Sequence, residues 1–266
     1  MINTALLGCV VIGLYAWADW LDASLARDAH ATGYLLYGAI GLLAAYNLRK
    51  KLTGLPLGSS RFWMQAHAYI GLATAPLFAL HLGWRAPDGW LEATLAGCFV
   101  ATFTSGVIGL YLTRTVPKQL ARTGQQYVYE RVPSLRSRVA AEAREAVLGG
   151  VRATGATTLA DLYADRLHGF FNRPRSLAYA IAPSGAARKR LFGELTASRR
   201  LLTDAERRAA ERLFALIRQK DDLDFHAARQ GLLKKWVFVH LALTFALLIL
   251  GALHGVLALA MQGAAA

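Results

Sequence analysis

Four of the seven histidines lie in apolar stretches of the sequence, in two pairs with the same spacing. His67 and His81 are 14 residues apart, and so are His240 and His254. Because 14 residues make just under four turns of α-helix, the two imidazoles of a pair face nearly the same way, about 21 Å apart along the axis. Imidazole is a common metal ligand, and ionisable side chains in apolar segments are rare unless they have a function. The spacing therefore predicts two ligand sites stacked along one pair of helices.

The two histidine segments also match in depth. A basic residue precedes the first histidine of each segment by six positions, Arg61 in one and Lys234 in the other. With the two helices parallel, the histidines fall level in two facing couples, and a bis-histidine haem iron needs one imidazole on each face of its macrocycle. We therefore predict two haems b with these axial ligands: His67 with His240, and His81 with His254.

Other residues around these segments suit haem that is not covalently bound. Cys9 and Cys98 offer neither a CxxCH sequence for covalent attachment nor a four-cysteine cluster. Arg85 lies one turn beyond His81 and Arg61 lies before His67, so we assign both arginines to haem propionates; snorkelling at a membrane surface explains them equally well. Glycines that would admit a macrocycle, or simply a neighbouring helix, are Gly71, Gly97, Gly106, Gly109 and Gly251.

Apolar runs long enough to cross a bilayer carry the histidines. A helix needs about 20 residues to cross roughly 30 Å of hydrocarbon. The first run lacks a basic n-region and has Asp19 and Asp22 where a cleavage site would fall, so we interpret it as a helix rather than a signal peptide. The five predicted spans are residues 3–20, 31–48, 62–83, 90–112 and 236–261, with the histidine pairs in the third and fifth.

The formal net charge of +13 is concentrated in one segment. Residues 115–235 contain 23 of the 30 lysines and arginines. By the positive-inside rule, the N-terminus and this segment are cytoplasmic and the C-terminus lies outside. Because the charge lies directly between predicted spans, topology and contact with anionic lipid explain it better than nucleic-acid binding does. We therefore predict a multi-pass protein of the cell (inner) membrane.

The basic segment itself is predicted to be mainly helical. Helices are expected over 134–148 and 159–171, and Thr203 followed by Glu206 has the spacing of a capping box that opens a run to about residue 219. Chain breaks are expected at 149–150, 172–174 and 183–185. The predicted fold is all-α: a four-helix membrane block over 1–114, a helical cytoplasmic domain over 115–235, and a fifth transmembrane helix in 236–266.

The segments HAYIGLATAPLFALH, residues 67–81, and HLALTFALLILGALH, residues 240–254, resemble the dihaem core of ferric reductase-like and NADPH-oxidase membrane domains. They are also similar to the haem core of cytochrome b in quinol–cytochrome c reductases. The resemblance implies bis-histidine b haems, one above the other, that relay electrons between the membrane faces. The sequence departs from both families, because it has no flavin or nicotinamide domain and no Pro-Glu-Trp-Tyr motif.

The function we favour is transmembrane electron transfer from a quinol or a cytoplasmic donor to a partner on the other face. Whether a quinone site exists, and whether the chain catalyses a reaction alone, stay open; we favour a cytochrome b subunit with other redox subunits or cytochromes as partners. The alternatives are a haem-free scaffold that recruits partners through its basic domain, and a metal or proton transporter. The third and fifth spans have little polarity for a transporter beyond Thr74 and Thr244. His30, His168 and His226 are expected in solvent, with His226 a weak candidate for proton handling.

Overall fold

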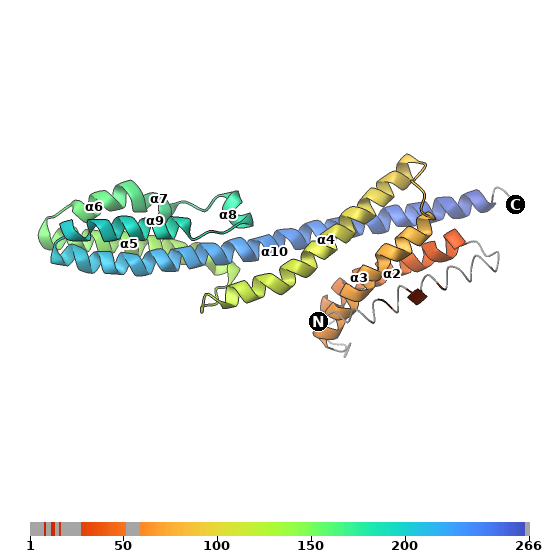
Figure 1. Cartoon of the computed structure of the whole chain (residues 1–266), viewed down its shortest axis with the longest axis horizontal. Helices are drawn as coiled ribbons and strands as arrows, with labels where there is room; N and C mark the ends of the chain where they lie inside the picture. The colour runs from red at the N-terminus through yellow and green to blue at the C-terminus, as the bar shows by residue number, and fades with distance from the viewer. Residues whose placement is uncertain (1–7, 9–11, 14–15, 17–27, 52–58, 264–266) are drawn as a thin grey trace. The chain divides into compact units, whose positions relative to one another are not determined.

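The structure is a computed structural model that describes residues 8, 12–13, 16, 28–51 and 59–263 (Figure 1). The first predicted span, residues 3–20, lies outside the described residues except for isolated positions. Every regular element among the described residues is helical, which confirms the all-α class for that part of the chain.

The chain divides into two compact units. Unit 1 comprises Met1–Tyr111 and Trp236–Ala266, and unit 2 comprises Leu112–Lys235. The boundaries predicted from the sequence lie after residues 114 and 235. Two helices contribute to both units: α4, Trp90–Ala121, and α10, Asp204–Gly263.

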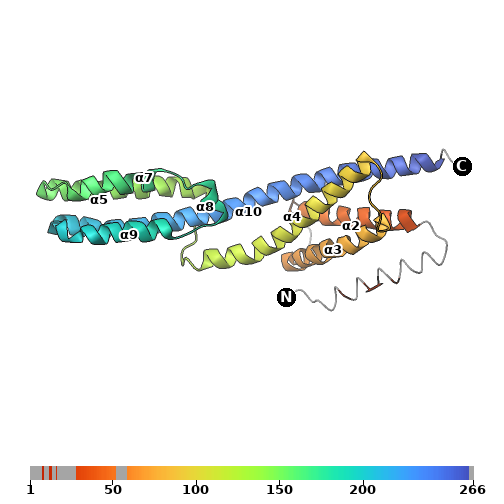
Figure 2. The ribbon, with the colours of Figure 1, turned by 45° about the horizontal axis from the view of Figure 1, so that its top comes forward.

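Unit 1 is a bundle of α2, Asp28–Lys51, and α3, Ser60–Leu82, with the first part of α4 and the last part of α10. Helices α2 and α3 lie side by side in both views (Figures 1 and 2). The buried core takes residues from all four helices: Leu36, Ile40, Leu77, Phe99 and Leu247. Phe78 stacks on Phe99 with ring centroids 4.0 Å apart, so packed side chains fill the bundle between the levels of the two histidine couples.

The ends of α3 are defined by local capping. The Ser59 side chain accepts a hydrogen bond from the Phe62 N–H at 3.3 Å, which satisfies one of the free donors of the first turn. The helix ends at Gly83, whose φ of 57° is left-handed and is most easily adopted by glycine. These caps set α3 close to the predicted 62–83 and include both His67 and His81 within it.

Two helices are long and apolar enough to cross a membrane by length and composition, α4 and the helix over Asp204–Met261. Helices α2 and α3 have 24 and 23 residues and are long enough, but neither contains a stretch apolar enough to meet the same criterion. Membrane association is therefore supported by these two helices. The five-span arrangement and its sidedness remain predictions.

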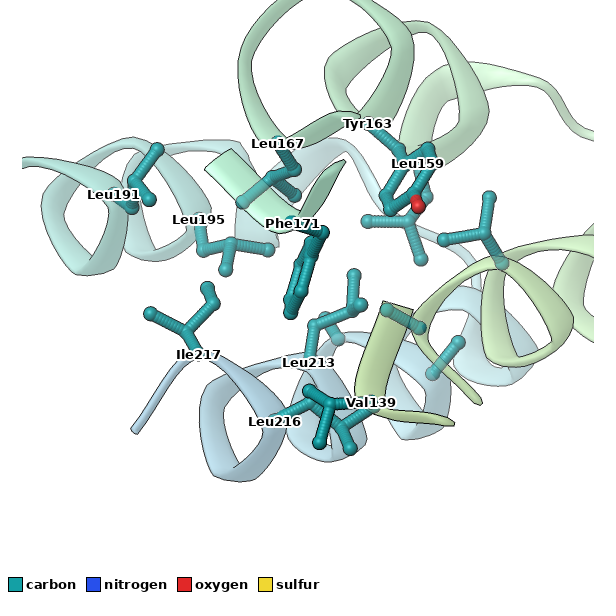
Figure 3. Packing of buried hydrophobic residues seen from close by; sticks show 14 of the residues in the cluster. Val139, Leu159, Tyr163, Leu167, Phe171, Leu191, Leu195, Leu213, Leu216 and Ile217 are labelled. Atoms are coloured by element: carbon teal, nitrogen blue, oxygen red, sulfur yellow. The ribbon is translucent and has the colours of Figure 1, made fainter. Parts of the chain in front are cut away.

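Unit 2 packs short helices against the first half of α10. In chain order these are α5 Val132–Thr154, α6 Thr158–Leu162, a π-helical turn Tyr163–Leu167, α7 His168–Asn172, α8 Leu177–Ile181 and α9 Ala186–Ser198, with 3-10 turns at Tyr129–Arg131 and Arg199–Leu201. Figure 3 shows Phe171, Leu195 and Leu213 turned toward one another in the apolar interior, where each is at most 2% exposed.

The helix boundaries correct two sequence predictions. The capping box is present, with Glu206 accepting from the Thr203 N–H at 3.0 Å, but the helix it opens continues beyond 219 into the last predicted span. Nothing between 219 and 236 breaks it, because that stretch has no proline and a single glycine, Gly231. The break at 149–150 is also wrong: Gly150 lies within α5, where a Cβ would be 3.7 Å from Ala209 of α10. The breaks at 172–174 and 183–185 are confirmed.

Candidate functional site

The first histidine couple joins α3 to α10 within unit 1. The ring centroids of His67 and His240 are 6.5 Å apart and the ring planes are inclined by 71°. Both side chains are half-buried. Two further aromatic rings flank this couple: Tyr46 lies 5.3 Å from His67, and Trp236 stacks on His240 at 5.5 Å. The couple is therefore the centre of a four-ring cluster.

The second couple lies 14 residues further along the same two helices. The ring centroids of His81 and His254 are 6.3 Å apart, with the planes inclined by 88°. Both residues are again half-buried. Since α3 and α10 present matching residues at both levels, the two helices run parallel here, and the two couples are about 21 Å apart along the helix axes. The structure thus has both of the pairings predicted from the spacing.

The ring separations suit one metal ion held between each couple. When two imidazole nitrogens bind one metal ion from opposite sides at about 2 Å, the ring centres lie roughly 6 Å apart. Any angle between the ring planes is compatible with this arrangement. Among the described residues no group of three or more His, Cys, Asp or Glu side chains is placed to hold a metal ion. A haem iron takes its four equatorial ligands from the porphyrin and needs two from the protein, so the residues present fit this group.

Glycines lie against one ring of each couple. A Cβ on Gly33 of α2 would lie 2.9 Å from Cε1 of His81, closer than real Cβ contacts allow. A Cβ on Gly106 of α4 would lie 3.6 Å from Cε1 of His240. Of the other predicted glycines, Gly109 faces Trp236 and Gly251 faces Tyr37, whereas a Cβ added to Gly71 or Gly97 would have no described neighbour within 4 Å.

Two buried hydroxyls accompany these glycines. Thr32 Oγ1 lies 3.4 Å from Nδ1 of His81, and Ser105 Oγ lies 3.3 Å from Nδ1 of His240. Thr32 is 2% exposed and Ser105 is 8% exposed. Thr32, Gly33 and Ser105 were not predicted from the sequence, because each lies on a helix other than that of the histidine it contacts. Trp236 was assigned no chemistry beyond a membrane-interface belt, yet its ring stacks on a candidate ligand.

The structure leaves the two predicted arginines in exposed positions. Arg61 lies in the first turn of α3 and Arg85 just beyond its last turn, and neither forms an ion pair with another described residue. Lys234, which matches Arg61 in the sequence, instead lies 2.5 Å from Glu130 within unit 2. A role for the two arginines in holding propionates therefore stays a prediction.

Comparison of the chain with protein families, with curated proteins and with solved structures found no match. The functional argument therefore depends on the geometry of the histidine couples and their neighbours.

His226 in unit 2 corrects another prediction. It was expected in solvent, but it is 1% exposed, with Nε2 2.7 Å from Thr123 Oγ1 and its ring edge-on to Tyr127 at 5.0 Å. Burial lowers the pKa of His226 below its ordinary value. His168, by contrast, is exposed as predicted.

Acidification should destabilise unit 2 through His226. The unfolded chain takes up a proton at this residue near pH 6.5, the ordinary pKa, whereas the folded chain does so only at lower pH. The free energy of unfolding should therefore fall as the pH drops below about 6.5, until the lowered folded-state pKa is passed. Urea-dependent proteolysis of the full chain in detergent at several pH values measures this slope.

The His226→Gln variant should lose that part of the slope, whereas His168→Gln, at an exposed position, should keep it. Asp221 and Asp222 have pKa values raised by burial and contribute the opposite slope at lower pH, but they are common to all three chains. Identical slopes in the wild type and His226→Gln would contradict the assignment.

Proposed function

We propose that this protein is a dihaem membrane cytochrome that transfers electrons between the two faces of the membrane. His67 and His240 would be the axial ligands of one b haem, and His81 and His254 those of the other. The observation that carries the proposal is the repetition of the same geometry: two imidazole couples with centroids 6.5 and 6.3 Å apart, 14 residues apart on the same two helices.

The chain would supply ligation, burial and orientation, while the bound haems supply one-electron chemistry. The four histidines provide neutral nitrogen donors. The core around Leu77, Phe99 and Leu247 excludes water between the two levels. Arg85 and Arg61 would pair with propionates near the two ends of α3.

The basic residues of unit 2 would be cytoplasmic, where they can contact anionic lipid and a redox partner. The donor would be a quinol or a docked cytoplasmic protein, and the acceptor a redox subunit or cytochrome on the other face. The transporter alternative gains no support from the two mid-span threonines, because both hydroxyls donate within their own helix: Thr74 to Gly71 O at 2.7 Å and Thr244 to His240 O at 2.8 Å.

The experiment that tests the proposal is a reduced-minus-oxidised visible spectrum of the detergent-purified full chain, with extracted haem quantified against protein. Two non-covalent, low-spin b haems per chain are expected. If protein expressed with an ample haem supply contains none, the cytochrome is excluded and the scaffold or transporter becomes the better interpretation.

A single methyl group on Gly33 should remove the haem of the His81–His254 couple. In Gly33→Ala the new Cβ would lie 2.9 Å from His81 Cε1, so the imidazole or helix α2 must shift. Haem content should fall from two per chain toward one, with the haem of the His67–His240 couple retained. Haem extraction and redox titration of the purified variant measure this loss.

The matched control is Gly38→Ala, on the same helix, where no described heavy atom lies within 4 Å of the new Cβ. Both changes raise helix propensity by about 1 kcal/mol, so a difference between them reports the contact with His81. Full haem content in Gly33→Ala would mean that this contact does not matter for ligation.

A further inference from the structure

A hydroxyl residue followed by glycine occurs beside one histidine of each couple. Thr32–Gly33 lies on α2 against His81, and Ser105–Gly106 lies on α4 against His240. In both cases the hydroxyl lies near Nδ1, and a Cβ built on the glycine would lie near Cε1, the ring carbon next to Nδ1, at 2.9 Å for Gly33 and 3.6 Å for Gly106. The two dipeptides come from different helices and contact histidines on different helices, yet both place a hydroxyl beside Nδ1 of an imidazole.

The chemistry of a ligating imidazole explains why the hydroxyl would be needed. A neutral histidine that binds a metal through Nε2 carries its proton on Nδ1, and that N–H ordinarily donates to a fixed acceptor outside the first coordination sphere. The acceptor fixes the tautomer and the ring orientation, and it makes the ligand more basic. At Gly33 the absence of a Cβ also leaves room for the ring edge of His81, which a Cβ would approach to 2.9 Å, whereas a Cβ on Gly106 would make an ordinary contact with His240 at 3.6 Å.

We propose that Thr32–Gly33 and Ser105–Gly106 are two ligand clamps, each with a hydroxyl that positions one axial histidine and tunes one haem. This inference rests on the proposed dihaem function. The Nδ1–H of His81 donates to Thr32 Oγ1, and the Nδ1–H of His240 donates to Ser105 Oγ. With the Nδ1 proton held in this way, Nε2 of each ring would be the atom that binds the haem iron.

Trp236 also restrains the Ser105 clamp. Trp236 Nε1–H donates to the backbone oxygen of Ser105 at 2.8 Å, and the same indole stacks on His240 with the planes inclined by 23°. The serine, the indole and the imidazole therefore restrain one another. Burial of both clamp hydroxyls means that a hydrogen bond lost here is not replaced by bulk solvent.

Helix α4 contains a control residue for a purely structural role of these hydroxyls. Thr102 is half-buried one turn before Gly106, and its hydroxyl donates to Cys98 O of its own helix at 2.7 Å. Thr102→Val therefore removes a half-buried helix hydroxyl that has no hydrogen bond to a histidine among the described residues. It controls for the general cost of losing a polar group in this bundle.

The test uses the full chain in detergent, with Ser105→Ala, Thr32→Val and Thr102→Val compared by haem titration and by spectroscopic redox titration. Ser105→Ala should weaken haem binding at the His67–His240 couple by about 10–100-fold and raise the midpoint potential of that haem, because a less basic imidazole stabilises ferric iron less. Thr32→Val should do the same at the His81–His254 couple. Each variant should leave the other haem unchanged, and Thr102→Val should change neither.

The hydroxyl-retaining variants Ser105→Thr and Thr32→Ser should restore the wild-type potentials. Loss of one haem alone in Ser105→Ala also supports the clamp, since the remaining haem shows that the bundle is folded. Wild-type potentials and affinities in both clamp variants, loss of both haems together, or equal effects in Thr102→Val would overturn it. A wild-type protein that binds no haem would instead defeat the proposed function, so the two failures are distinguishable.

Discussion

Leucine in place of His67 should reduce the haem content of the purified protein from two per chain to one. The His67 and His240 rings are 6.5 Å apart and constitute one proposed ligand couple, so removing either ring leaves the iron with a single protein ligand. The same reasoning applies to His81 and His254, whose rings are 6.3 Å apart. Extracted haem and the midpoint potential of the remaining haem measure the result.

The prediction also specifies which two histidines share each haem. His67→Leu and His240→Leu should lose the same haem, identified by its potential, and the other two leucine variants should lose the other haem. His168→Leu, at an exposed position in unit 2, is the control and should retain both. If His67→Leu and His81→Leu lost the same haem, the assignment of these two histidines to different haems would be wrong.

The histidine couples could be predicted because helix geometry leaves little freedom. A 14-residue spacing places two side chains on one face, and the equal offsets from Arg61 and Lys234 aligned the two segments. The parallel arrangement of the two helices followed from the predicted topology, in which both begin on the cytoplasmic side. The prediction therefore needed no knowledge of how the other helices pack.

The residues around the couples could not be found in the same way. Thr32 and Ser105 contact histidines 49 and 135 residues away, and such contacts depend on how the helices pack. A threonine or serine followed by glycine is common in helices of this kind, so the dipeptides carry no signal alone. Trp236 was assigned to the aromatic belt at a span end, so its stacking on His240 was not predicted.

Unit 2 shows the same limit of local reasoning. The capping box and the breaks at proline-containing segments depend on nearby residues, and both were predicted. Whether α10 ends near 219 or continues is instead decided by the absence of any interrupting residue. The burial of His226 arises from Thr123 and Tyr127, about a hundred residues earlier in the chain, so polarity alone gave the wrong environment.

Asparagine in place of Asp224 should be among the most destabilising single changes in unit 2. The carboxylate is fully buried; Oδ1 lies 2.6 Å from Arg136, and Oδ2 lies 2.6 Å from Lys220 and 3.0 Å from Arg175. Burial lowers the pKa of Lys220, and the charge and hydrogen bond of Asp224 oppose that shift. Removing the carboxylate leaves buried positive charge without its partner, for which the expected loss is about 3–5 kcal/mol in the free energy of unfolding.

Urea-dependent proteolysis of the full chain measures this loss, and Glu145→Gln is the control. Glu145 pairs with Arg152 at 2.9 Å, but both side chains are about two-thirds exposed, so that change should cost no more than about 1 kcal/mol. The cause can be separated from loss of packing by adding Lys220→Met, which removes the stranded ammonium while retaining an unbranched apolar chain. If the uncompensated charge is the main cause, the loss in the free energy of unfolding caused by Asp224→Asn should be smaller by more than about 1 kcal/mol in the Lys220→Met background. Equal effects in both backgrounds would mean that Lys220 is not the charge that Asp224 compensates.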